Sequence, residues 1–206
     1  MAKELIALLA RHGEIPANDP KQGIFRGWMD EALDDTGVKE AKFAAQKLTK
    51  YPIKRIVSSP MKRALMTAEI FSKELDLKIE QEAALMPFHT GFLTGENKDE
   101  FEDVYQFFMD NPEIAIPRGE SLDNVHDRVG GYFDSALKQS EKKLTLFVAH
   151  SSTAVCLKNL LGGKVSLYPG TDEVAPPGSV VGIYADGDGY EMEVLIQQGK
   201  PANYGS

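Results

Sequence analysis

Cysteine and long apolar runs are scarce in this 206-residue sequence, and each shortage excludes a class of protein. Cys156 is the single cysteine, so an intrachain disulfide is impossible and a reducing compartment such as the cytoplasm is favoured. No apolar run reaches the roughly 18 residues that a membrane-spanning helix requires. The apolar stretch at 5–9 is shorter than the core of a secretory signal, so we expect neither a leader nor a membrane partner.

Positive charge is also in short supply. Lysine and arginine number 23 against 31 aspartates and glutamates, which gives a formal net charge of −8. Proteins that bind the phosphates of nucleic acids need a basic excess, so we expect no nucleic-acid partner. A small anionic substrate remains compatible with this composition, because it requires only a local cationic pocket. The sequence carries no signal for an oligomeric state.

What the sequence does contain is a regular alternation of short apolar runs and segments with helical spacing. Strands are predicted at 5–9, 53–57, 77–80, 144–149, 179–184 and 191–196, and helices at 38–50, 59–75, 98–110, 121–139 and 150–161. This order predicts an α/β fold: a single three-layer α/β/α domain over 1–206 with a mostly parallel central sheet. The loop-rich segment at about 83–120 is predicted to form a small helical and loop cap. Thr36 and Ser59 are predicted to cap the first two helices, with Pro60 in the first turn of the second.

Arginine and histidine follow three of the predicted strands at the point where each strand ends. Arg11 and His12 come after the first strand, Arg63 shortly after the second, and His150 directly after the run at 144–149. Because the carboxyl ends of parallel strands open into a shared crevice, we expect these side chains to meet there. The forked donors of arginine match phosphate oxygens, and helix starts at Ser59 and His150 would add oriented amides.

Two histidines in such a pocket suit phosphoryl transfer. A neutral imidazole can attack phosphorus and form a covalent intermediate. A second imidazole can stabilise the negative charge on the transferring group. The residues themselves therefore predict a site for phosphate chemistry.

Taken in order, these motifs resemble those of the histidine phosphatase superfamily, also called the phosphoglycerate-mutase-like family, and the similarity covers nearly the whole chain. The segments that carry it are Arg11-His12-Gly13-Glu14, Asn18, Phe25–Asp30 with Leu33 and Gly37, Ser58–Ala68, Gly119-Glu120-Ser121 with Arg128, and Val148–Ser151. Each motif is short, and their joint occurrence in the family's order makes the resemblance specific.

The resemblance implies a phosphatase that works without metal or other cofactor. It implies that His12 is the nucleophile, that Arg11, Arg63 and His150 bind the transferring phosphoryl group, and that Asn18 and Ser151 add substrate contacts. Arg26, with Lys21 and Lys98, is a candidate for binding a second anionic group of the substrate. Aromatic side chains at the predicted rim are candidates for contacting its body: Phe25, Trp28, Phe88, Phe92, Tyr105, Phe107 and Phe108.

The general acid of the family is missing from both of its usual places. Pro87 stands where many members carry a glutamate, and Ser151 stands where another branch carries an aspartate. His89 is a candidate substitute in the same loop, and imidazole suits acid–base work near neutral pH. Glu120 and Glu96 are further candidates. A site with no dedicated acid is the remaining alternative, and it would suffice for good leaving groups such as aryl phosphates or phosphohistidine.

Three functions fit these residues. The first is hydrolysis of a small phosphorylated substrate, with water attacking the phosphohistidine. The second is a phosphoglycerate mutase. Two features disfavour it: the segment between Gly95 and His150 is short, and Arg26 stands where mutases usually carry a small serine. The third is a non-catalytic module that binds phosphorylated ligands, which retention of His12 disfavours. His126 is interpreted as a structural residue on a helix face.

Overall fold

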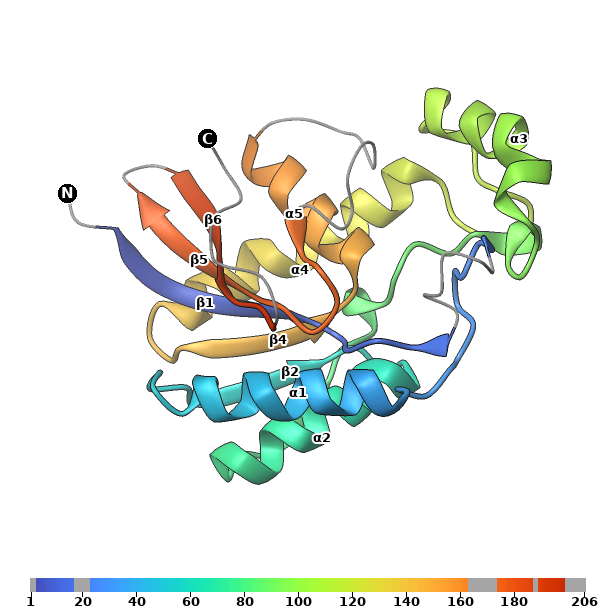
Figure 1. The fold of residues 1–206 in the computed structure, drawn as a ribbon. Coiled ribbons are helices and arrows are strands. Elements are labelled where there is room, and N and C mark those ends of the chain that lie inside the picture. The colour runs from blue at the N-terminus through green and yellow to red at the C-terminus, as the bar shows by residue number, and fades with distance from the viewer. Residues whose placement is uncertain (1–2, 17–22, 163–173, 187–188, 199–206) are drawn as a thin grey trace.

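A six-stranded sheet forms the centre of the fold in the computed structural model, which describes residues 3–16, 23–162, 174–186 and 189–198 (Figure 1). The strand order is β3-β2-β4-β1-β5-β6. The strands are β1 (Glu4–Arg11), β2 (Arg55–Ser58), β3 (Ile79–Gln81), β4 (Thr145–Ala149), β5 (Val180–Asp186) and β6 (Gly189–Ile196). The first four strands pair in parallel, while β5 and β6 add antiparallel partners at the β1 side. The prediction of a mostly parallel α/β sheet is confirmed.

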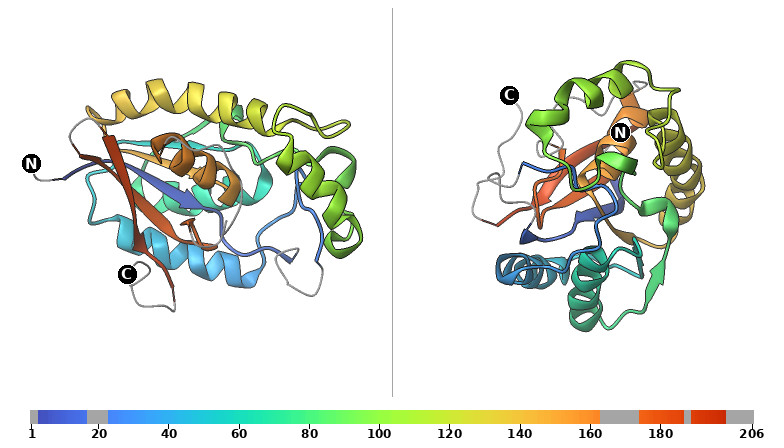
Figure 2. Two further views of the ribbon diagram at one scale, coloured as in Figure 1. Left: turned by 90° about the horizontal axis from the view of Figure 1, so that it is seen from above. Right: turned by 90° about the vertical axis from the view of Figure 1, so that its right-hand side faces the viewer.

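Helices cover both faces of this sheet (Figure 2). One face is covered by α1 (Asp35–Leu48) and α2 (Lys62–Leu75), and the other by α4 (Leu122–Ser140) and α5 (Ser151–Gly162). Helix α3 (Lys98–Asp110) stands apart from the sheet, on the side where β1 ends (Figure 1). Two 3-10 turns, η2 (Ala83–Leu85) and η3 (Gly91–Leu93), lie in the segment that leads to it. No helix within the described ranges is long and apolar enough to cross a bilayer.

Alternation along the central strands explains why their sequences are continuously apolar. In β1, Leu9 packs into the core beneath α4 and α5, while its neighbour Leu8 packs into the core beneath α1 and α2. Phe147 and Leu146 of β4 divide in the same way. Successive side chains of a strand point to opposite faces, so a sheet buried on both faces needs apolar residues at every position.

The starts of α1 and α2 differ from the prediction. Asp34, rather than Thr36, caps α1, because its side chain accepts a hydrogen bond from the Gly37 amide at 2.8 Å. Helix α2 begins at Lys62 rather than at Ser59, and the carboxylate of Asp30 accepts from the Lys62 amide at 2.6 Å. The first amide of α2 is therefore paired with a carboxylate of the chain itself, so the expected phosphate-binding helix start at Ser59 is not formed.

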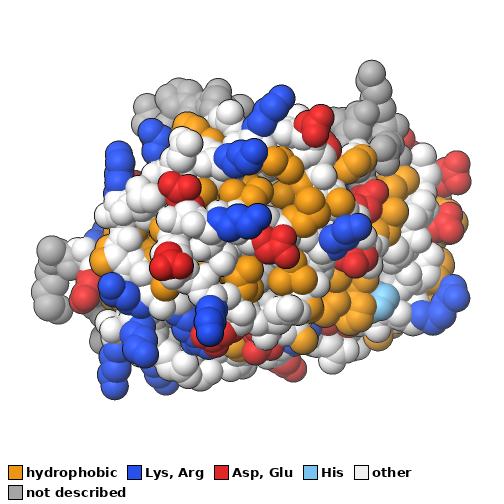
Figure 3. All heavy atoms as spheres, turned by 90° about the horizontal axis from the view of Figure 1, so that it is seen from below, with side chains coloured by type: hydrophobic (Ala, Val, Ile, Leu, Met, Phe, Trp, Pro, Cys, Tyr) orange, Lys and Arg blue, Asp and Glu red, His pale blue; other side chains and the backbone are white. Residues whose placement is uncertain are grey.

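The outer face on the side of α2 carries charges of both signs. Figure 3 shows Lys and Arg side chains interspersed with Asp and Glu side chains, and hydrophobic side chains gathered between them. Such a mixture creates no extended field of one sign across this face. This face therefore offers no cationic surface for a large anion.

Candidate active site

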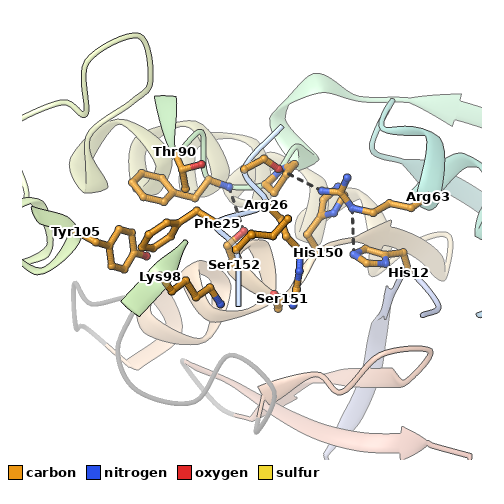
Figure 4. A pocket seen from close by; sticks show the side chains of 14 residues that line it. His12, Phe25, Arg26, Arg63, Thr90, Lys98, Tyr105, His150, Ser151 and Ser152 are labelled. Carbon is orange, nitrogen blue, oxygen red and sulfur yellow. Dashed lines mark hydrogen bonds between the residues drawn. The ribbon is translucent and has the colours of Figure 1, made fainter. Parts of the chain in front are cut away.

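The pocket lies where β1, β2 and β4 end, as the sequence predicted for the polar residues that follow these strands. His12 follows β1, Arg63 lies in the first turn of α2, and His150 follows β4; all three line the pocket. In the view of Figure 4, His12 and Arg63 lie on one side and Phe25 and Tyr105 on the other. One side thus holds the His12 ring and the Arg63 guanidinium, and the other holds aromatic rings together with Lys98.

Two neighbours fix the tautomer of the buried His12 ring. Its Nδ1 lies 2.7 Å from the Gly13 carbonyl oxygen, which can only accept, so Nδ1 carries the proton. Nε of Arg63 donates to Nε2 of His12 at 3.2 Å, so Nε2 carries no proton and its lone pair accepts this bond. Burial lowers the pKa of His12 well below its usual value, and the nearby charges of Arg63 and Arg11 lower it further. His12 is thus a neutral imidazole with its nucleophilic nitrogen inside the pocket.

Arg63 is held in place by the backbone of the loop that precedes α1. Its Nη1 donates to the Met29 carbonyl at 2.5 Å, and its Nη2 donates to the Gly27 carbonyl at 3.4 Å. Burial lowers the pKa of Arg63 to about 10, which leaves the guanidinium charged at neutral pH. The loop therefore aims a fixed positive charge at Nε2 of His12.

His150 lies beside His12, with the two ring centroids 5.1 Å apart. Its Nε2 pairs with Oγ of Ser59 at 2.9 Å, while its Nδ1 is buried without a hydrogen-bond partner among the described residues. Burial and the charge of Arg63 lower the pKa of His150 well below its usual value. Because a buried polar atom without a partner costs about 1–3 kcal/mol, a ligand oxygen bonded to this nitrogen would be favourable.

Arg11 is buried but is not among the residues that line the pocket. Its Nη1 donates to the Ala175 carbonyl at 2.9 Å. Its positive charge still lowers the pKa values of both His12 and His150. In this structure Arg11 therefore acts on the site through its charge.

A close approach of two backbones explains the glycine after His12. A Cβ atom on Gly13 would lie 2.4 Å from the Gly37 carbonyl oxygen, a distance that real Cβ atoms do not adopt. The Gly13 amide donates to Oγ1 of Thr67 at 3.3 Å, and this hydroxyl donates to the Arg63 carbonyl at 2.9 Å. The segment that follows β1 is thereby held against α1 and α2 next to the nucleophile.

The candidate acids lie outside the pocket lining. The His89 ring packs against Trp28 with 4.1 Å between centroids, and its Nδ1 accepts from the Gly91 amide at 3.0 Å. Glu120 forms an ion pair with Arg128 at 2.6 Å and accepts from the His89 amide at 2.9 Å. Glu96 is exposed. Among the pocket-lining residues that the structure describes, none is an aspartate or a glutamate.

Pro87 does line the pocket, and the loop that carries it is tied down at several points. Arg128 donates to the carbonyls of Ala84 and Met86, both at 2.9 Å. The Trp28 indole donates to the Pro87 carbonyl at 2.9 Å. We call residues 84–89 the anchored loop. Sequence reasoning gave Arg128 no role beyond its place in a motif, because its partners are backbone carbonyls about 40 positions away.

The remaining predicted contacts divide into three groups. Arg26, Lys98 and Ser151 line the pocket, with Phe25, Phe88 and Tyr105. Trp28, Phe92, Phe107 and Phe108 do not line it, and Phe107 is exposed on α3. Asn18 and Lys21 lie outside the described residues.

Two further side chains were not predicted as parts of the site. Ser59 pairs with His150, and Oγ of Ser152 accepts from the Phe88 amide at 3.1 Å. Both serines lie in or next to the motif segments, and this proximity was the only sequence feature that could have indicated a place in the site. His126 lies in α4 and bonds the Leu122 carbonyl at 2.9 Å, outside the pocket lining. Within the described parts of the chain, no cluster of three or more His, Cys, Asp or Glu side chains could hold a metal ion.

A neutral buried histidine, a second histidine and a fixed arginine at the ends of parallel strands define an enzyme of phosphoryl transfer. The chain belongs to the histidine phosphatase superfamily (branch 1), whose family model matches residues 7–197. Membership of this superfamily supports transfer of a phosphoryl group through a histidine.

Relatives of the chain include both phosphatases and mutases. Phosphoglycerate mutase of Schizosaccharomyces pombe is 33% identical over 142 residues, which span 64% of this chain and 66% of that protein. Phosphoserine phosphatase 1 of Hydrogenobacter thermophilus is 28% identical over 149 residues, 70% of each chain. The structure of phosphoserine phosphatase in complex with 3-phosphoglyceric acid from Entamoeba histolytica superposes with a TM-score of 0.77 at 21% identity, covering 96% of this chain and 98% of that one. This last likeness shows the shared fold.

Proposed function

We propose that this protein is a phosphatase that hydrolyses a small phosphorylated substrate through a phosphohistidine on His12. The observation that carries the proposal is the state of His12: a neutral ring whose Nε2 lone pair lies beside Arg63 in the pocket. A nucleophile must be unprotonated and correctly oriented to attack phosphorus, and the contacts of His12 support both conditions.

In the first step, the Nε–H of Arg63 exchanges Nε2 of His12 for a phosphoryl oxygen, the freed Nε2 lone pair attacks phosphorus, and a P–N bond forms. The bond from phosphorus to the leaving oxygen breaks, and its electron pair departs on that oxygen. Arg63 balances the charge on the phosphoryl oxygens. Nδ1 of His150, which carries the proton of the neutral ring when Nε2 accepts from the Ser59 hydroxyl, donates to one of them. The positive charge that develops on the His12 ring is shared with the Gly13 carbonyl, which accepts from Nδ1.

In the second step, a water oxygen attacks the same phosphorus from the side vacated by the leaving group. The P–N bond breaks and its electron pair returns to Nε2, which restores the neutral ring. The water proton passes to solvent, and inorganic phosphate leaves. Ser151, at the start of α5, supports phosphate binding through the favourable dipole of the helix start.

The mutase alternative has support from the Schizosaccharomyces pombe relative. A mutase must protonate and deprotonate alkyl hydroxyl groups, which calls for an acid–base side chain at the leaving oxygen. The absence of carboxylates from the described lining favours hydrolysis. Incubation with 3-phosphoglycerate and a bisphosphate primer separates the two, because a phosphatase releases inorganic phosphate while a mutase produces the 2-phosphate isomer.

Steady-state kinetics of His12→Ala on 4-nitrophenyl phosphate test the proposed role of His12. We expect the variant to lose at least roughly 1,000-fold in kcat, as removal of a nucleophile does in other enzymes. His89→Asn is the matched control, because it removes a histidine that lies outside the pocket lining. Turnover by His12→Ala at the wild-type rate would refute the role of His12. Binding of phosphate without any turnover by the wild type would instead favour the non-catalytic module.

A further inference from the structure

The side of the pocket beyond the phosphoryl site combines positive charge with aromatic rings. Arg26 and Lys98 line it together with Phe25, Phe88 and Tyr105. The Phe25 and Tyr105 rings pack against each other with 4.8 Å between centroids. In the view of Figure 4, Arg26 lies between this aromatic side and the pair His12–Arg63. A group attached to the phosphoryl group would therefore meet Arg26 first and the rings next.

Arg26 acts electrostatically on the reacting centre. Its positive charge contributes to lowering the pKa values of both His12 and Arg63. Coulomb interactions of this size require short separations, because water and salt screen them over about 10 Å. Arg26 also lines the same pocket as His12 and Arg63, so its guanidinium faces the space that a substrate bonded to that phosphorus would occupy.

The carboxylic acids and imidazoles considered as general acids are engaged elsewhere or lie outside the described lining. The only proton on the neutral His12 ring is directed at the Gly13 carbonyl. Glu120 is held by Arg128 and the His89 amide. The Nδ1 of His89 accepts from the Gly91 amide, so its proton is on Nε2, and the ring packs against Trp28 outside the pocket lining. Pro87, which lines the pocket two positions before His89, has no side-chain proton to donate. The described lining offers positive charge where a carboxylic acid would otherwise stand.

We propose that the substrates are aryl phosphates, and that Arg26 stabilises the departing aryloxide by charge in place of proton transfer. This inference rests on the proposed function and specifies its substrate class. When the P–O bond breaks, the electron pair remains on the aryl oxygen as an anion, which solvent protonates after it leaves the pocket. The positive charge of Lys98 supports the same anion, and the rings of Phe25, Phe88 and Tyr105 receive the planar apolar body.

The leaving-group dependence of kcat/KM tests this proposal, because kcat/KM reports the step in which the leaving oxygen departs. The probes are 4-nitrophenyl phosphate and phenyl phosphate, with benzyl phosphate as a matched ester that has the same ring on an alkyl oxygen. A general acid contributes about 100-fold to 10,000-fold to such a step, so without one benzyl phosphate should react at least about 100-fold more slowly than phenyl phosphate. Rates within about threefold of each other would overturn the proposal.

Substitution of Arg26 isolates its contribution. We expect Arg26→Met to lose about 10-fold to 100-fold on phenyl phosphate and clearly less on 4-nitrophenyl phosphate, whose anion needs little stabilisation. Arg26→Lys should retain the wild-type ratio between the two substrates. Lys62→Met is the control, because it removes an exposed charge next to Arg63 that lies outside the pocket lining. Equal losses by Arg26→Met on both substrates would exclude a role at the leaving oxygen.

Failure of this proposal and failure of the proposed function give different results. If benzyl and phenyl phosphate react equally and His12 still becomes phosphorylated, the enzyme is a histidine phosphatase with an undetected acid. If no ester phosphorylates His12, the proposed function itself is wrong.

Discussion

The chemistry of His12 depends on two contacts that belong to neighbouring residues. The Gly13 carbonyl holds the proton on Nδ1, and Arg63 faces the lone pair on Nε2. Neither contact creates reactivity alone, but together they permit a single neutral tautomer. The identity of His12 as a candidate nucleophile followed from its place after a strand, whereas its tautomer required the positions of both neighbours.

Stability at acidic pH provides a test of the buried histidines. Both His12 and His150 have pKa values lowered below 6.5 in the folded state, so the unfolded chain binds more protons as pH falls through 6.5. Each group therefore removes up to about 1.4 kcal/mol of stability per pH unit below that value. We expect His12→Asn to lose less stability than the wild type between pH 7 and pH 5.5, measured by urea unfolding. Parallel curves for the two proteins would show that His12 titrates normally.

Ser59 is a positioning residue for His150. Because its hydroxyl fixes one ring nitrogen of His150, Ser59→Ala should leave the ring free to turn away from the phosphoryl group. We expect a loss of about 10-fold in kcat, within the range for one hydrogen bond of about 0.5–1.5 kcal/mol. Ser59→Thr, which keeps the hydroxyl, should recover part of this loss. An unchanged kcat in Ser59→Ala would show that the contact has no part in positioning His150.

At the scale of elements, the anchored loop shapes the pocket wall where the family's acid is usually placed. Arg128 of α4 donates to three carbonyls of this loop, and Glu120 joins Arg128 to the His89 amide. The arrangement uses Glu120 as an acceptor for the loop rather than as a pocket side chain. Glu120 and Arg128, more than 30 positions further along the chain, thereby hold Pro87 at the pocket wall.

Arg128→Met and Glu120→Gln separate anchoring from acid catalysis. Arg128→Met removes the donor to the loop carbonyls and leaves Glu120 unpaired, so we expect a loss of about 2 kcal/mol in stability and a raised KM. Glu120→Gln keeps an oxygen acceptor for the His89 amide, and we expect it to retain most of the activity. The measurements are thermal unfolding and kinetics on phenyl and benzyl phosphate. A collapse of activity in Glu120→Gln, selectively on the benzyl ester, would identify Glu120 as the acid.

Helices whose starts depend on neighbouring residues were predicted well from the sequence. The amphipathic segment at 98–110 has the same bounds as α3, with Asn97 as its cap. Helix α4 begins one residue after the predicted start at Ser121, and Ser121 caps it in a capping box with Asn124. The start of α2 could not be predicted, because the carboxylate that pairs with its first amide is Asp30, 32 positions earlier. The role of Glu120 as an ion-pair partner and loop acceptor could not be predicted for the same reason, because Arg128 and the His89 amide come together with it only in the folded chain.

At the scale of the whole molecule, an acidic chain gathers several positive side chains in the pocket at the ends of β1, β2 and β4. The formal net charge is −8, yet Arg26, Arg63 and Lys98 line one pocket, and the charge of the buried Arg11 also lowers the pKa of His12. The site therefore joins β1, β2 and β4, which the sheet order brings together from distant parts of the sequence. Binding of an anion should stabilise the fold as a unit.

Thermal unfolding in the presence of orthovanadate or inorganic phosphate tests this link. A ligand that binds only the folded state at 100 times its Kd adds about 2.7 kcal/mol to stability, so the Tm of the wild type should rise with phosphate concentration. Arg63→Met should show a much smaller rise. Chloride at matched ionic strength is the control for salt effects. Equal shifts in both proteins would place the anion away from the pocket.

Identification of the phosphorylated residue tests the central claim most directly. Reaction with an excess of 4-nitrophenyl phosphate, stopped in alkaline denaturant to preserve the acid-labile P–N bond, should leave a phosphoryl group that tandem mass spectrometry assigns to His12. The same treatment of His12→Ala should leave no phosphorylated histidine. A phosphoryl group on His150 or on any other residue, or rapid turnover with no phosphoenzyme at all, would contradict the account.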